Sequence, residues 1–329
     1  MADGLLRLGG PLDIPGSLEG YRRSGDDLLD RWDGAVWLRV LPLDGRKVAV
    51  AARPVGTVAA PALRVATDGG QGARAAGRAL AGAFVTAPAA LRELVAADPV
   101  IAAAAERWPG VGPVLQRDLL TAVVRSISAQ QITLRFAAVL RARLARRFGV
   151  RHTVPVPGGL GDGPVASGGP VDASATTPDG PAAATGGQPA TGEVWSLDAE
   201  ALAGAEVAEL RALQFSNAKA VAIVTVAGAV ADGRLRLDEL WVLPDEQVVD
   251  RLVAFPGIGR WTAEWLLART LGRPRVVAGD LGVRKAVGAA YLGGRLPSPD
   301  EVRAATAHWG AAAGVAQQLL LHELAHRPA

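Results

Sequence analysis

Three short runs in the first third of the chain alternate between apolar and polar residues. They cover residues 35–40, 48–52 and 62–66, and Asp44 and Gly45 form a turn after the first run. A period of two is typical of strands with one buried face, so these runs predict a short antiparallel sheet. A helix near Arg22 and Asp27 precedes it. We expect residues 1–85 to form a small N-terminal α+β domain.

The spacing of apolar residues becomes helical in residues 115–151. Leu119, Leu120, Val123 and Ile127 mark one buried face of a helix. The same stretch holds one acidic residue, Asp118, and many arginines: Arg117, Arg125, Arg135, Arg141, Arg143, Arg146, Arg147 and Arg151. Such a basic face is a candidate surface for nucleic-acid phosphates, and the alternative is a solvated helix face.

Residues 153–192 differ from the rest of the chain in composition. They are rich in Pro, Gly, Ala, Ser and Thr, and they contain no periodic pattern and no aromatic residue. A segment of this kind buries too little apolar surface to offset the entropy of ordering, so we expect a disordered insertion. Helical patterns resume at Leu197, so the insertion interrupts a helical region without ending it.

A glycine-rich loop joins two helical patterns within residues 245–272. The loop reads Pro256-Gly257-Ile258-Gly259, and the second helix starts near Arg260. Glycines allow a sharp turn and close approach of a ligand, and the free amides at a helix start bind phosphate. Asp280 stands just ahead of another helical pattern and is a plausible N-cap. A phosphate-binding hairpin with a nearby carboxylate suggests chemistry on a nucleic acid.

Two motifs carry a resemblance to a known family. FPGIGRWTA at residues 255–263 and GDLGVRK at residues 279–285 resemble the helix-hairpin-helix DNA glycosylases, especially the AlkA-type 3-methyladenine DNA glycosylases. Apart from the insertion, residues 115–324 follow that pattern, and the N-terminal part fits it more loosely. The resemblance implies a mainly α fold with two helical lobes, formed by residues 86–152 and 193–329, behind the antiparallel sheet.

The resemblance also implies roles for Asp280 in the second motif and for two tryptophans in and just after the first. Asp280 would be the catalytic carboxylate that stabilises positive charge on the deoxyribose and orients water. Trp261 and Trp265 lie one helical turn apart and would line the base pocket, although two such tryptophans also suit a core. Bifunctional members carry a lysine at position 261, so Trp261 implies hydrolysis without strand cleavage. An electron-rich pocket favours alkylated, positively charged purines.

DNA contacts follow from the resemblance as well. The wedge that replaces the flipped nucleotide falls at Gln131, where these enzymes can carry Leu, and Ile132 is the fallback. Ala312 stands where some relatives have a further pocket tryptophan, which would leave one wall open. Lys219 could contact a phosphate or merely solvate its helix, and we favour the second role. The residues that we expect to contact DNA are Gly257, Ile258, Gly259, Arg260, Thr262, Gln130, Gln131 and Arg125.

Composition narrows the possible cofactors. The absence of cysteine excludes disulfides, thiolate zinc sites and the iron–sulfur cluster that some relatives carry. The four histidines show no ligand spacing. The resemblance implies at most a monovalent cation, Na⁺ or K⁺, held by backbone carbonyls of the hairpin, and no other cofactor is required. The matching carbonyls belong to Val253, Phe255 and Ile258.

The remaining expectations concern partners and location. The net charge is only +3, so affinity for DNA must come from local patches. The start resembles no signal peptide and no apolar run is long enough to span a membrane, which predicts a cytoplasmic, nucleoid-associated bacterial protein without a membrane partner. We expect a monomer that acts on damaged double-stranded DNA. The alternatives are a glycosylase for deaminated or oxidised bases and a non-catalytic DNA-binding protein.

Overall fold

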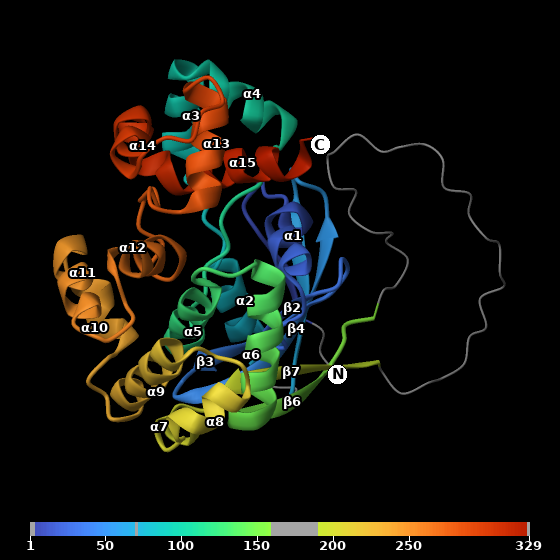
Figure 1. Cartoon of the computed structure of the whole chain (residues 1–329). Coiled ribbons are helices and arrows are strands. Elements are labelled where there is room, and N and C mark those ends of the chain that lie inside the picture. Colours follow the sequence, from blue (N-terminus) through green and yellow to red (C-terminus); the bar gives the residue numbers. More distant parts are fainter. Residues whose placement is uncertain (1–3, 70–71, 159–189, 328–329) are drawn as a thin grey trace.

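The chain forms an N-terminal sheet with helices and two helical lobes, each part with its own apolar core (Figure 1). The computed structural model describes residues 4–69, 72–158 and 190–327. The expected fold class, a mainly helical protein with a small N-terminal antiparallel sheet, is confirmed. Within these residues no helix is both long enough and apolar enough to cross a membrane.

The N-terminal sheet is antiparallel, in the order β1-β5-β4-β3-β2. The three strands expected from alternation correspond to β3, β4 and β5, and strand pairing extends each of them. Asp44 and Gly45 both have positive φ, as a tight hairpin turn between β3 and β4 requires. The five strands are β1 (Gly4–Arg7), β2 (Asp30–Trp32), β3 (Trp37–Leu43), β4 (Arg46–Gly56) and β5 (Pro61–Thr67).

Both faces of this sheet are covered. Alternate residues of β4 explain how: Val50 belongs to the core beneath the helices, and Ala51 belongs to the core on the opposite face. The first face packs against α1 (Ile14–Ser24) and α2 (Ala73–Ala81), and the second packs against a hairpin of β6 (Gly149–Pro155) and β7 (Thr191–Leu197).

This hairpin corrects the expectation of a disordered segment over residues 153–192. Residues 153–155 and 191–192 are paired in β6 and β7, because Val154 and Val194 bury their side chains against the sheet. Periodicity in such short strand ends is too brief to stand out in the sequence. The middle of the expected insertion, residues 159–189, lies outside the described residues.

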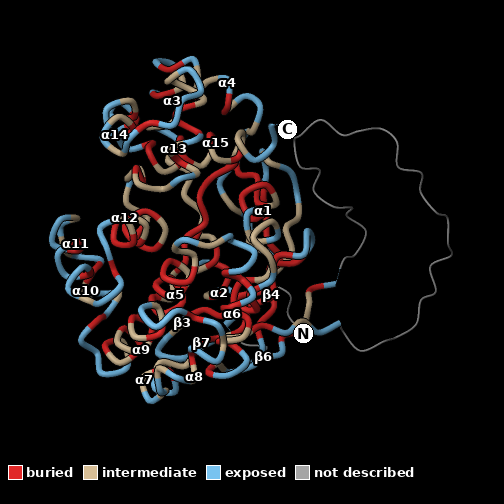
Figure 2. Tube along the Cα trace, viewed as in Figure 1, coloured by how far each residue is buried: buried red, intermediate tan, exposed pale blue. Residues whose placement is uncertain are grey.

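The first helical lobe surrounds one continuous core. Helix α9 lies within it and is apolar on nearly all sides, and Figure 2 shows buried segments along α5 and α12. Ser216 caps α9 by accepting a hydrogen bond from the Lys219 amide. The helices of this lobe are α5 (Leu119–Ala129), α6 (Leu134–Phe148), α7 (Ala199–Ala203), α8 (Val207–Ala212), α9 (Asn217–Ala231), α10 (Leu237–Val242), α11 (Asp245–Val253) and α12 (Arg260–Arg269).

The second lobe combines two distant parts of the sequence. Helices that directly follow the N-terminal sheet pack against the C-terminal helices around Trp309 and Ile101. Its elements are α3 (Pro88–Ala97), α4 (Pro99–Arg107), α13 (Leu281–Tyr291), α14 (Pro299–Thr306), the 3₁₀ helix η1 (Ala307–Ala312) and α15 (Ala313–His326). The chain therefore passes from the first lobe to the second between α12 and α13, the segment that carries Asp280.

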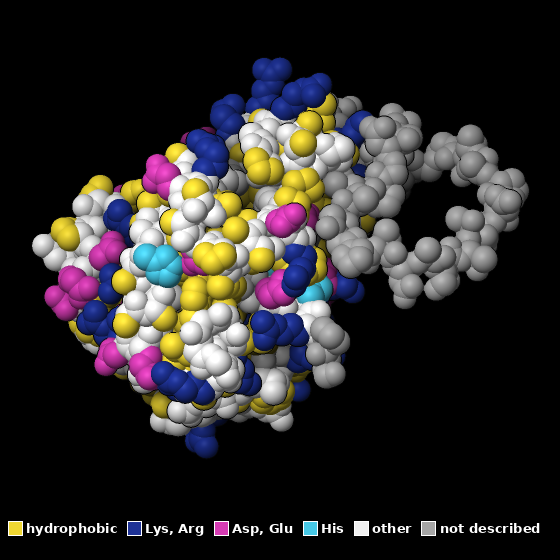
Figure 3. Space-filling view, turned by 90° about the horizontal axis from the view of Figure 1, so that it is seen from above, with side chains coloured by type: hydrophobic (Ala, Val, Ile, Leu, Met, Phe, Trp, Pro, Cys, Tyr) yellow, Lys and Arg dark blue, Asp and Glu magenta, His cyan; other side chains and the backbone are white. Residues whose placement is uncertain are grey.

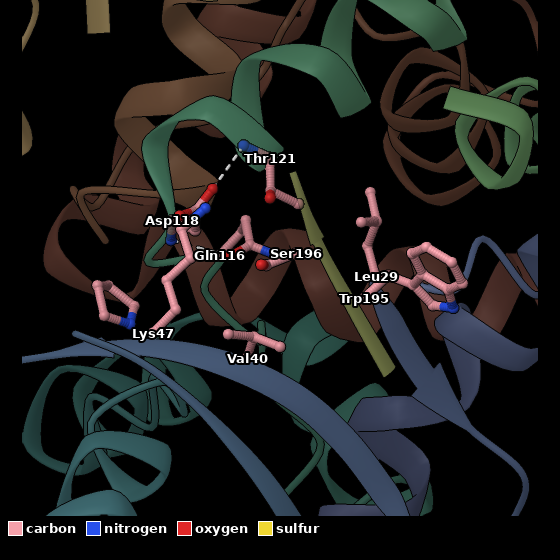
Figure 4. Close-up of a pocket in the computed structure, with 9 residues that line it drawn as sticks. Leu29, Val40, Lys47, Gln116, Asp118, Thr121, Trp195 and Ser196 are labelled. Carbon is pink, nitrogen blue, oxygen red and sulfur yellow. Dashed lines mark hydrogen bonds between the residues drawn. The ribbon is translucent and has the colours of Figure 1, made fainter. Parts of the chain in front are cut away.

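The sheet packs closely against the first lobe. Asp118 caps α5 at this junction, where its carboxylate accepts a hydrogen bond of 2.7 Å from the Thr121 amide (Figure 4). The space left between Val40, Trp195 and their neighbours is about 10 Å³. Such a space holds about one water molecule at most, so the junction is tightly packed.

Buried charges join the two parts. The Asp27 carboxylate lies 2.7 Å from Arg125 Nη2 and 2.8 Å from Arg141 Nε. Asp30 forms a fully buried ion pair with Arg39. Burial opposes ionisation of Asp27, but the Arg125 and Arg141 charges hold the pKa of its carboxyl below the usual value. The network connects the N-terminal domain to α5 and α6.

We expect the substitution Asp27→Ala to lower the free energy of unfolding by about 3–5 kcal/mol, because two buried guanidinium groups lose their partner. Urea denaturation followed by circular dichroism measures this loss. Asp300→Ala is the control, since Asp300 is exposed and pairs only with Arg303, and it should change stability little. Equal effects of the two substitutions would contradict the role assigned to the network.

Candidate active site

The hairpin loop between α11 and α12 depends on its glycines. Gly257 has φ +75°, and a Cβ atom there would lie 2.5 Å from the Ala222 Cβ of α9. Gly259 precedes α12 and offers no side chain to cap it. The first amides of α12 therefore have no side-chain acceptor, which leaves them available to an anion such as phosphate.

A second turn faces this loop, at the end of α5. Gln131 has φ +59° and is exposed, a conformation that is unfavourable for a residue with a side chain. The Lys219 ammonium holds the turn by donating hydrogen bonds of 3.0 Å to the Ser128 carbonyl and 2.6 Å to the Gln130 carbonyl. The expectation that Lys219 merely solvates its own helix is therefore wrong.

Gln130 connects the turn to the hairpin. Its Nε2 atom donates to the Gly257 carbonyl at 3.1 Å and lies 3.2 Å from Thr262 Oγ1. The Thr262 side chain is buried and bonded within the protein, so DNA would meet its backbone amide rather than its hydroxyl, and the DNA contacts of Thr262 and Gln130 stay predictions. Their polar side chains serve to fix two surface loops relative to each other.

The other expected DNA contacts divide into exposed and buried groups. Arg260 is exposed on the hairpin, where it pairs with Glu246 and Glu264 at 3.3 and 3.2 Å. The side chain of Ile258 is buried in the first-lobe core, so only its backbone can face a ligand. Ile132 also packs against this core, which makes Gln131 the better-placed candidate for a wedge.

The expectation of a basic rim along α5 and α6 needs correction. Arg125 and Arg141 point inward to Asp27, since buried carboxylates attract them more strongly than solvent does. Arg147 pairs with Glu209 and Arg117 stacks on Trp241. Arg135 and Arg146 are exposed without an ion pair to any described residue. On another face, seen from above Figure 1, Figure 3 shows basic side chains interspersed with acidic ones.

A cavity of about 270 Å³ lies where α1, α5, α12 and the start of α13 meet. Trp261 and Trp265, one turn apart on α12, both line it together with Asp280. The three predicted pocket residues therefore line one cavity. Both tryptophans are also partly packed, and Trp265 contacts the first-lobe core. Further lining residues are Ser17, Tyr21, Ser24, Arg125, Ser126, Leu134, Arg269 and Gln318.

Asp280 is fixed in place by its role as a helix cap. Its Oδ1 atom accepts a hydrogen bond of 3.0 Å from the Val283 amide, which confirms the predicted cap. Its Oδ2 atom accepts no hydrogen bond from the described residues. The preceding turn is held by Gln317, whose side chain accepts from the Val277 amide at 2.7 Å. One carboxylate oxygen is therefore positioned by the protein and the other is free.

A close contact at Gly279 and the charge of Arg269 also shape the cavity near Asp280. A Cβ atom at Gly279 would lie 3.2 Å from the Trp261 ring, so glycine allows the Asp280 segment to approach the indole closely. Arg269 is partly buried, and desolvation lowers the pKa of its guanidinium, while the opposite charge of Asp280 counters that effect. Arginine stays charged in proteins, so the cavity holds a compensated pair of charges.

The N-terminal domain forms a wall of the cavity that sequence reasoning missed. Tyr21 on α1 lies 5.2 Å below the Arg125 guanidinium and accepts a hydrogen bond of 3.0 Å from Arg39. Burial raises the pKa of the Tyr21 phenol, so it keeps its proton. No local pattern around Tyr21 signals this, because the contact depends on packing between distant segments.

The open wall expected from Ala312 is not found. Ala312 is buried in the second-lobe core, away from the cavity, because η1 packs against α3 and α15. Instead, α15 contributes Gln318, whose Oε1 atom accepts a hydrogen bond of 2.8 Å from Arg269. Gln318 and Arg269 thus add polar groups to the lining of the cavity.

The carbonyls proposed for a monovalent cation are compatible with that role. The Phe255 carbonyl accepts a hydrogen bond from the Ile258 amide at 3.2 Å and keeps a second lone pair. The carbonyls of Val253 and Ile258 accept no backbone hydrogen bond from the described residues. The three carbonyls lie at the end of α11 and in the loop that follows it.

Comparison with known proteins assigns this arrangement to a family. Residues 124–311, more than half of the chain, match the profile of the HhH-GPD superfamily base excision DNA repair protein. The chain belongs to the HhH-GPD superfamily. The match includes the α5 turn, the hairpin, both tryptophans and Asp280, so the part of the cavity formed by α5, α12 and Asp280 lies within the matched region.

Individual HhH-GPD proteins match the chain at low sequence identity or over a limited region. The chain is 32% identical over 111 residues to YfjP of Bacillus subtilis, provisionally named a DNA-3-methyladenine glycosylase, and this match covers 33% of the chain and 39% of that relative. The 3-methyladenine DNA-glycosylase from Archaeoglobus fulgidus has the same fold, with TM-score 0.72, 24% identity and coverage of 97% and 96%. The fold is also that of the Clostridium acetobutylicum 8-oxoguanine glycosylase/lyase in complex with DNA, with TM-score 0.65, 12% identity and coverage of 96% and 92%.

We expect Gly257→Ala to lower the free energy of unfolding by about 1–3 kcal/mol, because the new methyl group meets Ala222 and the positive φ becomes strained. The affinity of this variant for duplex DNA, measured by fluorescence anisotropy, should also fall. The matched control is Gly259→Ala, where φ is −88° and no atom lies within 4 Å of the new methyl group. The control should keep wild-type stability, and an equally large loss there would show that the steric argument is wrong.

Proposed function

We propose that this HhH-GPD protein is a monofunctional DNA glycosylase of base excision repair, acting as a monomer on double-stranded DNA. It releases alkylated purines of the 3-methyladenine kind by hydrolysis. The observation that carries the proposal is the single cavity that brings Trp261, Trp265 and Asp280 together. Helix α12 begins at the hairpin and carries both tryptophans, so the phosphate site and the cavity share one rigid element.

The hairpin and the α5 turn form the proposed DNA-binding surface. The amides that follow Gly259 bind a backbone phosphate, and a monovalent cation on the Val253, Phe255 and Ile258 carbonyls would add positive charge beside it. Gln131, exposed at the tip of its turn, fills the gap left by the flipped nucleotide. Flipping costs a few kcal/mol, and a damaged base that pairs poorly reduces that cost.

The cavity suits a flipped, positively charged purine. Indole faces attract cations with about 0.5–2 kcal/mol when water is excluded. Alkylation at a ring nitrogen gives the purine a positive charge and makes it a better leaving group. A volume of about 270 Å³ lies just below the range of roughly 300–1,000 Å³ typical of pockets for drug-sized ligands, which fits a single base.

Asp280 supplies the chemistry. As the C1′–N bond breaks, the base leaves with the electron pair and positive charge develops on the deoxyribose. The free Oδ2 atom of Asp280 stabilises this charge and orients the water whose oxygen bonds to C1′. The helix cap keeps the carboxylate from rotating away. One proton of the water stays on the new C1′ hydroxyl, and the other passes to the Asp280 carboxylate.

Two rivals remain open to test. A glycosylase for deaminated or oxidised bases would use the same fold, since the 8-oxoguanine glycosylase/lyase shares it. A non-catalytic DNA-binding protein would need the hairpin but no cavity. The paired indoles and the 3-methyladenine names of YfjP and the Archaeoglobus protein favour alkylated purines.

In a panel of duplexes with one alkylated, deaminated or oxidised base, we expect the wild-type protein to release the alkylated purine fastest. Asp280→Asn should lower its single-turnover rate about 100-fold or more, because asparagine still caps α13 but carries no charge. Chromatography of the free base measures both results. Asp118→Asn changes a helix cap outside the cavity and should keep the wild-type rate. Undiminished release by Asp280→Asn would refute the mechanism.

The strand should stay intact after base release. Trp261 offers no amine for a Schiff base, so borohydride should trap no covalent complex with DNA. Denaturing gels of reacted duplex before and after alkali measure this. Cleavage should appear only after alkali treatment, and a nicked strand without alkali would contradict the assignment as a monofunctional enzyme.

A further inference from the structure

Ser126 on α5 carries a buried hydroxyl without a partner. The residue is only 2% exposed, it lines the cavity, and its Oγ atom makes no hydrogen bond to any described residue. Buried polar groups are nearly always hydrogen-bonded, because an unsatisfied one is costly. Ser128, two positions further along the same helix, shows the normal case. Its hydroxyl donates a hydrogen bond to the Arg125 carbonyl and accepts one from Arg141.

The other small polar groups of the cavity already have partners. Ser17 donates to the Asp13 carbonyl and Ser24 donates to the Gly20 carbonyl. Gln318 accepts from Arg269. Ser126 therefore carries a buried hydroxyl without a partner among the described residues, on a residue that lines the same cavity as the two indoles.

We propose that Ser126 Oγ hydrogen-bonds to the polar edge of the flipped purine and strengthens the binding of the base. This inference rests on the proposed function. The tryptophans bind the faces of a base through its π system, and that attraction does not distinguish one edge from another. A hydroxyl both donates and accepts, so it pairs with an amino group as well as with a carbonyl. The cavity thus accepts alkylated purines derived from both adenine and guanine.

The test uses Ser126→Ala and two duplexes. One contains an alkylated purine on a 2′-fluorinated sugar, which resists hydrolysis, and the other contains a tetrahydrofuran abasic analogue, which has no base. We expect Ser126→Ala to lose about tenfold in affinity for the first duplex and in single-turnover release from the unfluorinated lesion. Affinity for the abasic duplex should stay unchanged, because the lost contact is to the base. Ser126→Cys keeps a weak donor and should give an intermediate result.

Stability separates this role from a structural one. Ser126→Ala should keep or raise Tm, because it removes an unsatisfied group, whereas the control Ser128→Ala should lower Tm by breaking two hydrogen bonds. Wild-type release and lesion affinity in Ser126→Ala would overturn the assignment, as would an equal loss on the abasic duplex. If the wild-type protein binds the fluorinated lesion no better than undamaged DNA, the proposed function itself fails.

Discussion

The buried ion network around Asp27 and Asp30 is the interaction on which the site depends. Asp27 lies beyond α1, while its partners Arg125 and Arg141 lie on α5 and α6. Buried ion pairs add little net stability, but breaking one leaves an uncompensated charge, so they favour one arrangement over others. The arrangement favoured here places α1 against α5, and the cavity is the space between them and α12. These charges add to the apolar contacts of Leu28 and Leu29 with the first-lobe core, so the N-terminal domain is held where it completes the pocket.

Lys219 and Gln130 have the same kind of role at the surface. Lys219 stabilises an α5 turn that contains a left-handed residue, and Gln130 bonds that turn to the hairpin. Two loops that would each be mobile alone thus form one unit on two helices of the same core. A phosphate held at the hairpin then has a fixed distance to Gln131. Sites built on rigid elements hold their geometry better than sites on free loops.

The sequence predicted the features that arise from local patterns. Strand alternation, the Asp280 cap and the shared face of Trp261 and Trp265 each need only a few adjacent residues, and the structure contains all three. The direction of Arg125 could not be predicted in this way, since an arginine turns inward or outward according to carboxylates far away in the sequence. That Tyr21 of the N-terminal domain lines the cavity could not be predicted for the same reason. Patterns identify elements, whereas long-range packing decides which side chains meet.

The unsatisfied groups of the cavity bear on which class of protein this is. A protein selected only to bind DNA through its hairpin would gain stability by filling a space of about 270 Å³ with apolar side chains. The chain instead keeps the space, lines it with two partly exposed indoles and leaves Ser126 Oγ and Asp280 Oδ2 without partners among the described residues. The buried hydroxyl lowers the stability of the free protein, and a ligand that bonds to it would offset that cost. A cavity with aromatic faces, one unpartnered hydroxyl and one free carboxylate oxygen is better explained by a base and its sugar than by a packing defect.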